Sequence, residues 1–312
     1  MKNLICITGP TASGKTALSI ALAQRLHTEI ISSDSMQIYR GMDIGTAKPT
    51  AAEQKGVPHH MIDIIDPSEL FSVARYTALA DACAQTLLSA GKIPIVVGGT
   101  GLYLDALIAG NAFTGDETDH RIRQKYEKMA DEQGNLAVHA CLAAVDPQAA
   151  ERLHPNNRKR VIRALEVFEQ TGMTLDAWNM KNKPAVPKYD AVKIGLCPTE
   201  RETLYQRINQ RVDQMMEDGL LAEAQRLWES GQLTGTAAQA IGYKELVDFL
   251  EGKCSLEDCV ETLKCRTRNY AKRQLTWLRR DPTVHWITYD AHSDFAEVLQ
   301  RSTDYLAEQG IQ

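Results

Sequence analysis

Apolar residues along the chain follow two alternating patterns. Short runs that are apolar throughout predict buried strands, and between them an apolar residue every three or four positions predicts helices. The predicted strands are residues 4–8, 29–33, 61–65, 93–97 and 192–197. One helical pattern, before the fourth strand, has apolar positions at Tyr76, Leu79, Ala80, Cys83, Leu87 and Leu88. Apolar strands joined by helices predict an α/β fold with a parallel sheet covered on both faces.

The stretch from residue 112 to residue 188 breaks this alternation. It has helical patterns only, with many charged side chains, and it ends in a proline-containing segment, 181–187, before the last predicted strand. Such a pattern is typical of a helical domain inserted into a sheet domain. We therefore expect a core of residues 1–111 and 189–312 and an all-helical insertion of residues 112–188.

A further helix is expected in the core after the strand at 192–197. Thr199 and Glu202 have the T-x-x-E spacing of a capping box, which predicts a helix start. The apolar positions that follow fall on one face of that helix: Leu204, Ile208, Val212 and Met215.

Composition is that of an ordinary soluble protein, with 44% apolar and 24% charged residues. No window approaches the ~18 apolar residues of a membrane span, and no signal peptide precedes the first strand. The seven cysteines are scattered without a C-x-x-C pair, which argues against zinc and predicts reduced thiols. We interpret the closest three, Cys254, Cys259 and Cys265, as helix packing. We expect a cytoplasmic monomer with no membrane contact.

The first predicted strand runs directly into a phosphate-binding motif. The motif is G-x-x-x-x-G-K-T, and a helical pattern follows it. This order lets backbone N–H groups surround a phosphate at the positive end of a helix. Lys15 adds a full charge, and the hydroxyl of Thr16 is a ligand for Mg²⁺. We expect a diphosphate or triphosphate to bind at Gly9, Pro10, Thr11, Ala12, Ser13, Gly14, Lys15 and Thr16.

Two other strand ends carry candidate chemistry, because ligands of parallel sheets bind at the carboxyl ends of the strands. Asp34 follows the second strand, where a carboxylate can hold Mg²⁺, act as a general base, or only cap a turn. The fourth strand ends in glycines around Thr100, where a hydrolytic P-loop enzyme needs an Asp. Asp66 and Asp34 remain candidates for that acid. The glycines predict that a bulky group packs against the backbone there.

The net charge of −5 hides two basic clusters. Residues 264–280 contain no acid and carry Tyr270 and Trp277 among their Lys and Arg residues, and residues 158–163 form a second acid-free cluster. Such stripes are typical of proteins that bind a nucleic-acid backbone. A solvated helix face explains either cluster alone, so this interpretation depends on their occurring together. For Tyr270 and Trp277 we favour a packing role over a role as platforms on which bases stack.

Several segments together resemble the tRNA dimethylallyltransferase family. They are residues 9–16, 33–39, 41–49, 98–100, 154–156, 163–166 and 272–277. The similarity runs over nearly the whole chain, and the chain lacks the zinc finger of eukaryotic members. The family transfers a dimethylallyl group from dimethylallyl diphosphate to N6 of the adenosine 3′ to the anticodon, tRNA position 37. The resemblance implies a P-loop NTPase-like fold whose P-loop holds the diphosphate, with no NTP consumed.

The resemblance also implies roles for individual residues. Asp34 is expected to take the N6 proton, and Lys15 with Mg²⁺ on Thr16 to stabilise the leaving pyrophosphate. Thr100 is expected to contact the target base, while Arg123 and Arg211 contact the diphosphate. Contacts with the tRNA anticodon stem-loop are expected at Asp34, Ser35, Met36, Gln37, Thr100, Arg123, Lys159, Arg160, Val161, Ile162, Arg163, Gly242, Tyr243, Lys272, Arg273, Gln274, Trp277 and Arg279.

Two other functions remain open at this point. An adenylate isopentenyltransferase would prenylate a free nucleotide, and a small-molecule P-loop kinase would use ATP as its donor. Both alternatives leave the basic clusters and the insertion dispensable, whereas a function on tRNA requires them.

Overall fold

A parallel β-sheet forms the centre of the chain. The computed structural model describes residues 2–111, 120–290 and 293–311. Its sheet has six strands in the order β3-β2-β4-β1-β5-β6, paired in parallel throughout. The strands are β1 (Leu4–Thr8), β2 (Ile30–Ser32), β3 (His59–His60), β4 (Ile95–Gly98), β5 (Ala191–Pro198) and β6 (Val284–Tyr289). The predicted α/β class is confirmed.

Two strands differ from the prediction. The run at 61–65 is not a strand, because the short β3 lies before it at His59–His60 and Ile65 makes only an isolated bridge with Tyr39. β6 was missed, since only Val284, Ile287 and Tyr289 of its side chains are buried in this edge strand. A half-polar edge strand lacks the continuous apolar run used to find the others.

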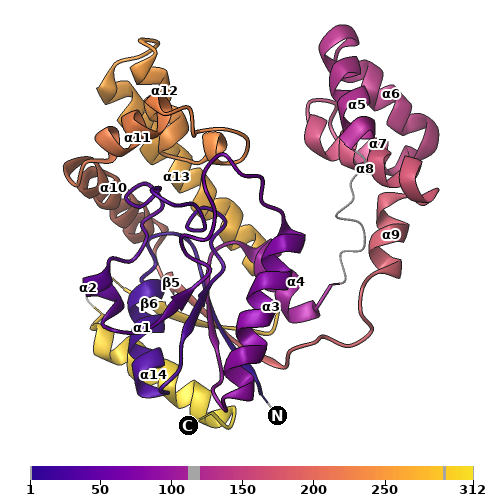
Figure 1. The fold of residues 1–312 in the computed structure, drawn as a ribbon. Coiled ribbons are helices and arrows are strands. Elements are labelled where there is room, and N and C mark those ends of the chain that lie inside the picture. The colour runs from indigo at the N-terminus through magenta and orange to yellow at the C-terminus, as the bar shows by residue number, and fades with distance from the viewer. Residues whose placement is uncertain (1, 112–119, 291–292, 312) are drawn as a thin grey trace. The chain divides into compact units, whose positions relative to one another are not determined.

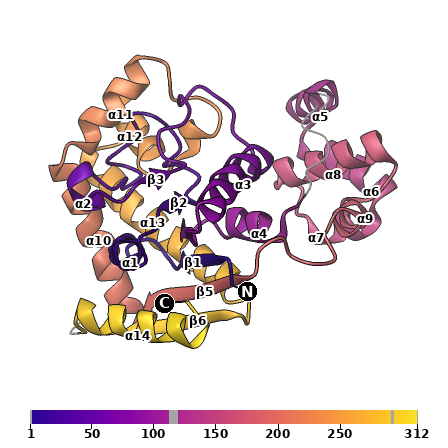
Figure 2. The same cartoon turned by 60° about the horizontal axis from the view of Figure 1, so that its bottom comes forward.

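Helices cover both faces of the sheet. On one face α1 (Lys15–Arg25) and α14 (Phe295–Glu308) pack against the odd-numbered side chains of β1. On the other face lie α3 (Val73–Ser89) and α4 (Gly101–Ala109), as Figures 1 and 2 show. The remaining core helices are α2 (Ala51–Gln54), α10 (Arg201–Glu217), α11 (Leu220–Glu229), a 3₁₀ turn η1 (Ala237–Gln239), α12 (Tyr243–Leu250) and α13 (Leu256–Leu278).

The capping box predicted at Thr199 does not form. The N-cap of α10 is Glu200, without a side-chain capping bond, and the N–H of Thr199 donates to the carbonyl of Tyr289 at 2.8 Å. Thr199 therefore extends the pairing with β6 and does not begin the helix. The expected buried face of α10 is present, with Leu204, Ile208 and Val212 buried.

A separate helical unit spans Asn111–Val186, and the core unit comprises Met1–Gly110 and Pro187–Gln312. These limits differ from the expected 112–188 by one and two residues. Its helices are α5 (His120–Gln133), α6 (Asn135–Val145), α7 (Pro147–Arg152), α8 (Arg158–Thr171) and α9 (Leu175–Lys181). They bury an apolar cluster of their own that includes Val138, Leu142, Val161 and Leu165.

One pair of cysteines is not reduced, contrary to the expectation. Cys254 and Cys259 form a disulfide bond, so the prediction that all cysteines are reduced is wrong here. Cys254 precedes the N-cap of α13 and Cys259 lies one turn inside that helix, which brings their Cα atoms to 6.6 Å. Cys6, Cys83, Cys141, Cys197 and Cys265 are free. In the described residues, no helix is long and apolar enough to cross a membrane.

Candidate functional site

Three loops meet at the carboxyl edge of the sheet, because β2, β4 and β1 are neighbours there. Two of these loops carry a buried hydroxyl without a hydrogen-bond partner in the described part of the chain, Ser13 after β1 and Ser33 after β2, whereas the Thr100 hydroxyl after β4 interacts with that of Tyr270. An unpartnered buried polar group costs about 1–3 kcal/mol. Two such hydroxyls at one edge indicate a place where a ligand supplies the missing partners.

The backbone of the P-loop is shaped by its two glycines. A Cβ on Gly9 would lie 2.2 Å from the carbonyl oxygen of Leu196, so only glycine fits against β5. Gly14 has a φ of +87° immediately before α1 begins. The loop therefore ends with the free N–H groups of a helix N-terminus, which favour an anion.

Lys15 carries the strongest electrostatic signal in this loop. Its Nζ donates to the carbonyl oxygen of Pro10 at 2.6 Å. Burial, reinforced by the positive charge of Arg211 and opposed by the negative charge of Asp34, lowers the pKa of Lys15 to about 7. A diphosphate next to Lys15 would favour the charged ammonium.

Two arginines on α10 line the P-loop cavity, a space of about 630 Å³ beside residues 12–17. Arg207 donates from Nε to the carbonyl oxygen of Ala12 at 3.0 Å, and burial lowers the pKa of Arg211. Sequence analysis identified Arg211 and missed Arg207. Arg207 and Arg211 are four residues apart, so they lie on neighbouring turns of the same helix face. This spacing was visible in the sequence and could have predicted that Arg207 lies beside Arg211.

A second space, which we call the Asp34 cavity, adjoins the first because Arg211 lines both. Its volume is about 270 Å³. Polar groups of Thr11, Asp34 and Tyr270 lie on its wall. The rest of the lining is largely apolar and includes Met36, Ile208, Val212, Met215, Leu220, Ile241 and Leu263. A phosphate-binding loop thus lies next to a carboxylate and an apolar space.

Asp34 makes turn contacts with only one of its oxygens. Oδ1 accepts from the N–H groups of Met36 at 2.8 Å and Gln37 at 3.4 Å. Within the described residues Oδ2 makes no hydrogen bond. Asp34 can therefore cap the turn through Oδ1 and still act as a base through Oδ2. Gln37, an expected tRNA contact, uses its side-chain amide to donate to the carbonyls of Thr46 and Ala47.

The prediction that a bulky group packs on the glycines after β4 is confirmed. A Cβ on Gly99 would lie 1.9 Å from Nε2 of Gln274, and one on Gly101 would lie 2.1 Å from the Trp277 ring. Gln274 also accepts from the N–H of Thr11 at 2.9 Å. Gln274 is buried beside the P-loop and joins α13 to it, and its contact with tRNA stays a prediction.

The basic stripe on α13 divides into two halves. Lys264 pairs with Asp213 at 2.8 Å, and Arg266 pairs with Glu245 at 2.6 Å, so these two cations of the first half are neutralised within the protein, while Arg268 donates to the Asn209 side chain at 2.6 Å. The second half contains exposed cations that make no ion pair in the part of the chain that the structure describes: Lys272, Arg273, Arg279 and Arg280. Trp277 is 38% exposed and donates to Asp105, which fits the packing interpretation.

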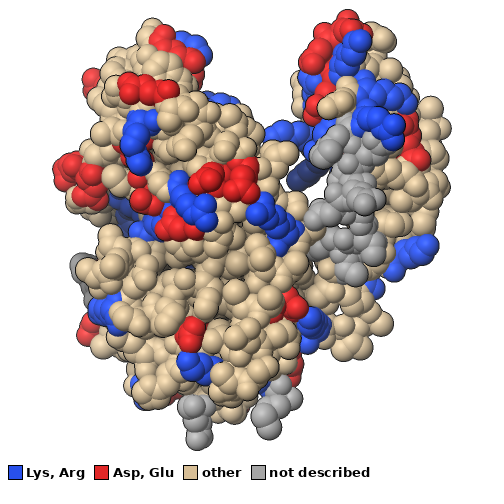
Figure 3. Space-filling view, in the orientation of Figure 1, with Lys and Arg blue, Asp and Glu red and all other residues tan. Residues whose placement is uncertain are grey.

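The basic cluster of the helical unit is also divided. Lys159 and Arg160 are exposed, whereas the side chains of Val161 and Ile162 are buried in the unit's apolar cluster. The expectation that Val161 and Ile162 contact tRNA is therefore wrong for their side chains, because α8 turns them inward. Figure 3 shows Lys and Arg side chains gathered with acidic ones on the visible face of this unit.

Arg123 is held within the helical unit. Its guanidinium donates to both oxygens of Glu166, at 2.8 and 2.9 Å, and the Glu166 side chain is fully buried. Arg163 lies 3.6 Å from the same carboxylate. Nε and Nη2 of Arg123 are therefore occupied by Glu166, whereas its Nη1 makes no hydrogen bond within the described residues, and Arg163 is a second cation beside the buried charge of Glu166.

Residues 242 and 243 are both buried but have different surroundings. Tyr243 is fully buried and donates its hydroxyl to Glu223 at 2.6 Å, so the expected contact between its side chain and tRNA is wrong. Gly242 lines the Asp34 cavity and has a φ of +104°. A contact of Gly242 with a substrate stays a prediction.

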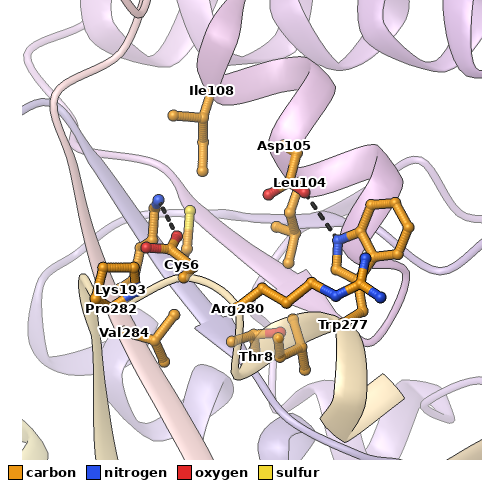
Figure 4. A pocket seen from close by; sticks show the side chains of 12 residues that line it. Cys6, Thr8, Leu104, Asp105, Ile108, Lys193, Trp277, Arg280, Pro282 and Val284 are labelled. Carbon is orange, nitrogen blue, oxygen red and sulfur yellow. Dashed lines mark hydrogen bonds and ion pairs between the residues drawn. The ribbon is translucent and has the colours of Figure 1, made fainter. Parts of the chain in front are cut away.

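A third cavity of about 390 Å³ lies between α4 and the end of α13, over β1 and β5 (Figure 4). Two of its charged side chains are engaged within the protein, since Lys193 pairs with Asp281 at 2.5 Å and Asp105 accepts from Trp277 at 2.8 Å. Burial raises the pKa of the Cys6 thiol to about 12, so this cavity holds no reactive thiolate. We therefore place the candidate site at the first two cavities.

Comparisons with known proteins agree over nearly the whole chain. The IPP transferase family model matches residues 37–281, and one for isopentenyl transferase matches residues 2–64. A tRNA dimethylallyltransferase of Acetivibrio thermocellus is 46% identical over 100% of this chain and 99% of its own length. Two solved structures are also similar. A tRNA isopentenylpyrophosphate transferase from Bacillus halodurans has a TM-score of 0.75 at 46% identity, covering 99% of this chain and 96% of that one. A eukaryotic dimethylallyltransferase acting on tRNA has a TM-score of 0.84 at 32% identity, covering 99% of this chain and 80% of that one.

Proposed function

This chain belongs to the IPP transferase family, and from that membership we propose that it transfers the dimethylallyl group of dimethylallyl diphosphate to a tRNA. The acceptor is N6 of the adenosine 3′ to the anticodon, and pyrophosphate is released. The observation that carries the proposal is the contiguity of the P-loop cavity and the Asp34 cavity across Arg211. The relatives named for transfer to tRNA match over their full length, so transfer to a free nucleotide and a kinase activity are not favoured.

The residues of the two cavities meet the demands of this reaction. The N6 lone pair is delocalised into the adenine ring, so transfer needs both a stabilised leaving group and removal of the N6 proton. The P-loop amides, Lys15 and Arg211 stabilise the diphosphate, with Arg207 beside them. Asp34 takes the proton through its free Oδ2, and the Thr100 hydroxyl, next to Tyr270 on the wall of the Asp34 cavity, bonds to the acceptor base. The adenosine must leave the anticodon-loop stack to reach them.

A divalent cation is consistent with a diphosphate donor, and we propose Mg²⁺ held by the Thr16 hydroxyl. Mg²⁺ takes few protein ligands and keeps phosphate oxygens and waters around it. This fits the site, because Thr16 lines the P-loop cavity together with Lys15 and Arg211. When bound, the ion would neutralise charge on the leaving diphosphate.

The donor distinguishes this function from a kinase. We expect label to pass from radiolabelled dimethylallyl diphosphate to tRNA with release of pyrophosphate, and ATP turnover to be negligible. Incubation of the protein with tRNA and each donor in turn measures both. Strong tRNA-stimulated hydrolysis of ATP, without prenylated tRNA, would overturn the proposal.

Binding of tRNA should depend on the exposed cations of α13 and α8. The double variant Lys272→Ala/Arg273→Ala should weaken binding and flatten the dependence of log K on log[salt] by about 0.7–0.9 for each tRNA phosphate that the protein no longer neutralises. Lys159→Ala/Arg160→Ala should act in the same direction, since both cations are exposed and make no ion pair within the described residues. Lys264→Ala is the matched control, because Lys264 is already paired with Asp213. Wild-type slopes in both double variants would show that the clusters are solvated faces.

A further inference from the structure

Glu223, on α11, is a buried carboxylate bound by one segment of the chain. Its oxygens accept from three successive backbone N–H groups, those of Asp43 at 2.9 Å, Ile44 at 3.0 Å and Gly45 at 3.0 Å. The hydroxyl of Tyr243 donates to it as a fourth group, at 2.6 Å. Hydrogen bonds to a charged acceptor are stronger than those between neutral groups.

The segment that Glu223 binds forms part of the Asp34 cavity. Gly45, Thr46 and Ala47 line that space. The side chain of Gln37 donates to the carbonyls of Thr46 and Ala47, and the N–H of Gln37 lies 3.4 Å from Oδ1 of Asp34. One continuous set of hydrogen bonds thus runs from the Glu223-bound segment to the carboxylate expected to act as base.

Packing fixes the same segment from the side of α12. A Cβ on Gly45 would lie 2.6 Å from the ring of Tyr243, so the ring packs directly on the backbone of residue 45. Gly242, the residue before Tyr243, also lines the cavity.

We propose that Glu223 is a positioning residue for the acceptor: it holds residues 43–47 as a wall of the Asp34 cavity and so sets the acceptor base against Asp34. The proposal rests on the function given above. Three successive N–H groups converge on this carboxylate, and a neutral amide offers one acceptor oxygen where the carboxylate offers two. Glu223→Gln places an N–H₂ group against these donors, so the wall must shift.

The ends of the segment are anchored independently of Glu223. The Nζ of Lys48 pairs with Asp43 and Asp63 at 2.5 Å each, and Arg226 donates to the carbonyl of Gly41 at 3.0 Å. Loss of the carboxylate therefore affects the middle of the segment and leaves the fold and the P-loop in place.

The test compares Glu223→Gln with Tyr243→Phe, which removes only the fourth donor. We expect Glu223→Gln to lower kcat/KM for tRNA by about 10-fold or more, the scale of losing one charge-assisted interaction, while the Kd for inorganic pyrophosphate stays within about twofold. Tyr243→Phe should remain within about threefold of the wild type in both. Hydrogen exchange of the 41–48 peptide should be faster in Glu223→Gln only.

Gly45→Ala provides a second approach, since it pushes the same segment from the Tyr243 side and should reproduce the selective loss on tRNA. Unchanged activity on tRNA in Glu223→Gln would overturn the proposal. An equal loss of pyrophosphate binding would also overturn it, because Glu223 would then support the whole core. If the wild type fails to prenylate tRNA, the proposed function fails, and the exchange measurement still tests whether Glu223 holds this segment.

Discussion

Replacing Asp34 with Asn should slow the prenyl-transfer step by about 10²–10⁴-fold, the usual contribution of a general base. Asn keeps the oxygen that accepts from the N–H groups of Met36 and Gln37, so the turn is preserved. It removes the basic carboxylate that takes the N6 proton. Single-turnover rates at saturating tRNA and dimethylallyl diphosphate measure this step, and the Kd for tRNA should be unchanged.

Asp66→Asn is the matched control for Asp34. Asp66 also follows an apolar run at the strand edge, but it is exposed and pairs with Arg40 at 3.4 Å. Its variant should transfer at the wild-type rate. The assignment of Asp34 as base is wrong if Asp34→Asn keeps its single-turnover rate and loses only affinity for tRNA or Mg²⁺.

Replacing Lys15 with Ala should lower kcat/KM for dimethylallyl diphosphate by about 10²–10³-fold, the cost of removing one preorganised group that stabilises developing charge. Arg123→Ala tests the proposed contact from the helical unit in the same assay. Its effect should be smaller, because the charge of Arg123 is already balanced by Glu166. An unchanged kcat/KM in Arg123→Ala would remove Arg123 from the diphosphate site and leave it as a structural partner of Glu166.

The lowered pKa of Lys15 makes diphosphate binding depend on pH. With a pKa of about 7, Lys15 is mostly neutral at pH 8 in the free protein. A bound diphosphate stabilises the ammonium and raises that pKa, so binding at pH 8 takes up a proton. The uptake should shrink below pH 7, where Lys15 is already charged. Calorimetry of pyrophosphate binding in two buffers of different ionisation enthalpy measures it, and Lys15→Ala should abolish it. Equal uptake in that variant would assign the proton to another group.

Local motifs were enough to place the proposed reacting groups at one edge of the sheet. The P-loop, Asp34 and Thr100 follow apolar strands, and the parallel order of β2, β4 and β1 brings their ends together. These positions follow from the sequence because each depends on a short segment and on one rule of sheet geometry.

Long-range contacts were not accessible to the same reasoning. Glu223 lies 180 residues from Asp43, and Gln274 lies 263 residues from Thr11, so no local pattern links either pair. The inward orientation of Val161 and Ile162 was missed for a different reason. A basic cluster was taken as one surface, although the 3.6-residue period of α8 turns two of its members toward the core.

The position of the product tests the central claim most directly. After incubation with dimethylallyl diphosphate, the tRNA is digested with a nuclease of known specificity, and the fragments and nucleosides are analysed by mass spectrometry. The account predicts one dimethylallyl group on N6 of the adenosine 3′ to the anticodon, and none with Asp34→Asn in the same time. Prenylation of free adenine nucleotides with unmodified tRNA, or transfer of phosphate in place of the prenyl group, would contradict it.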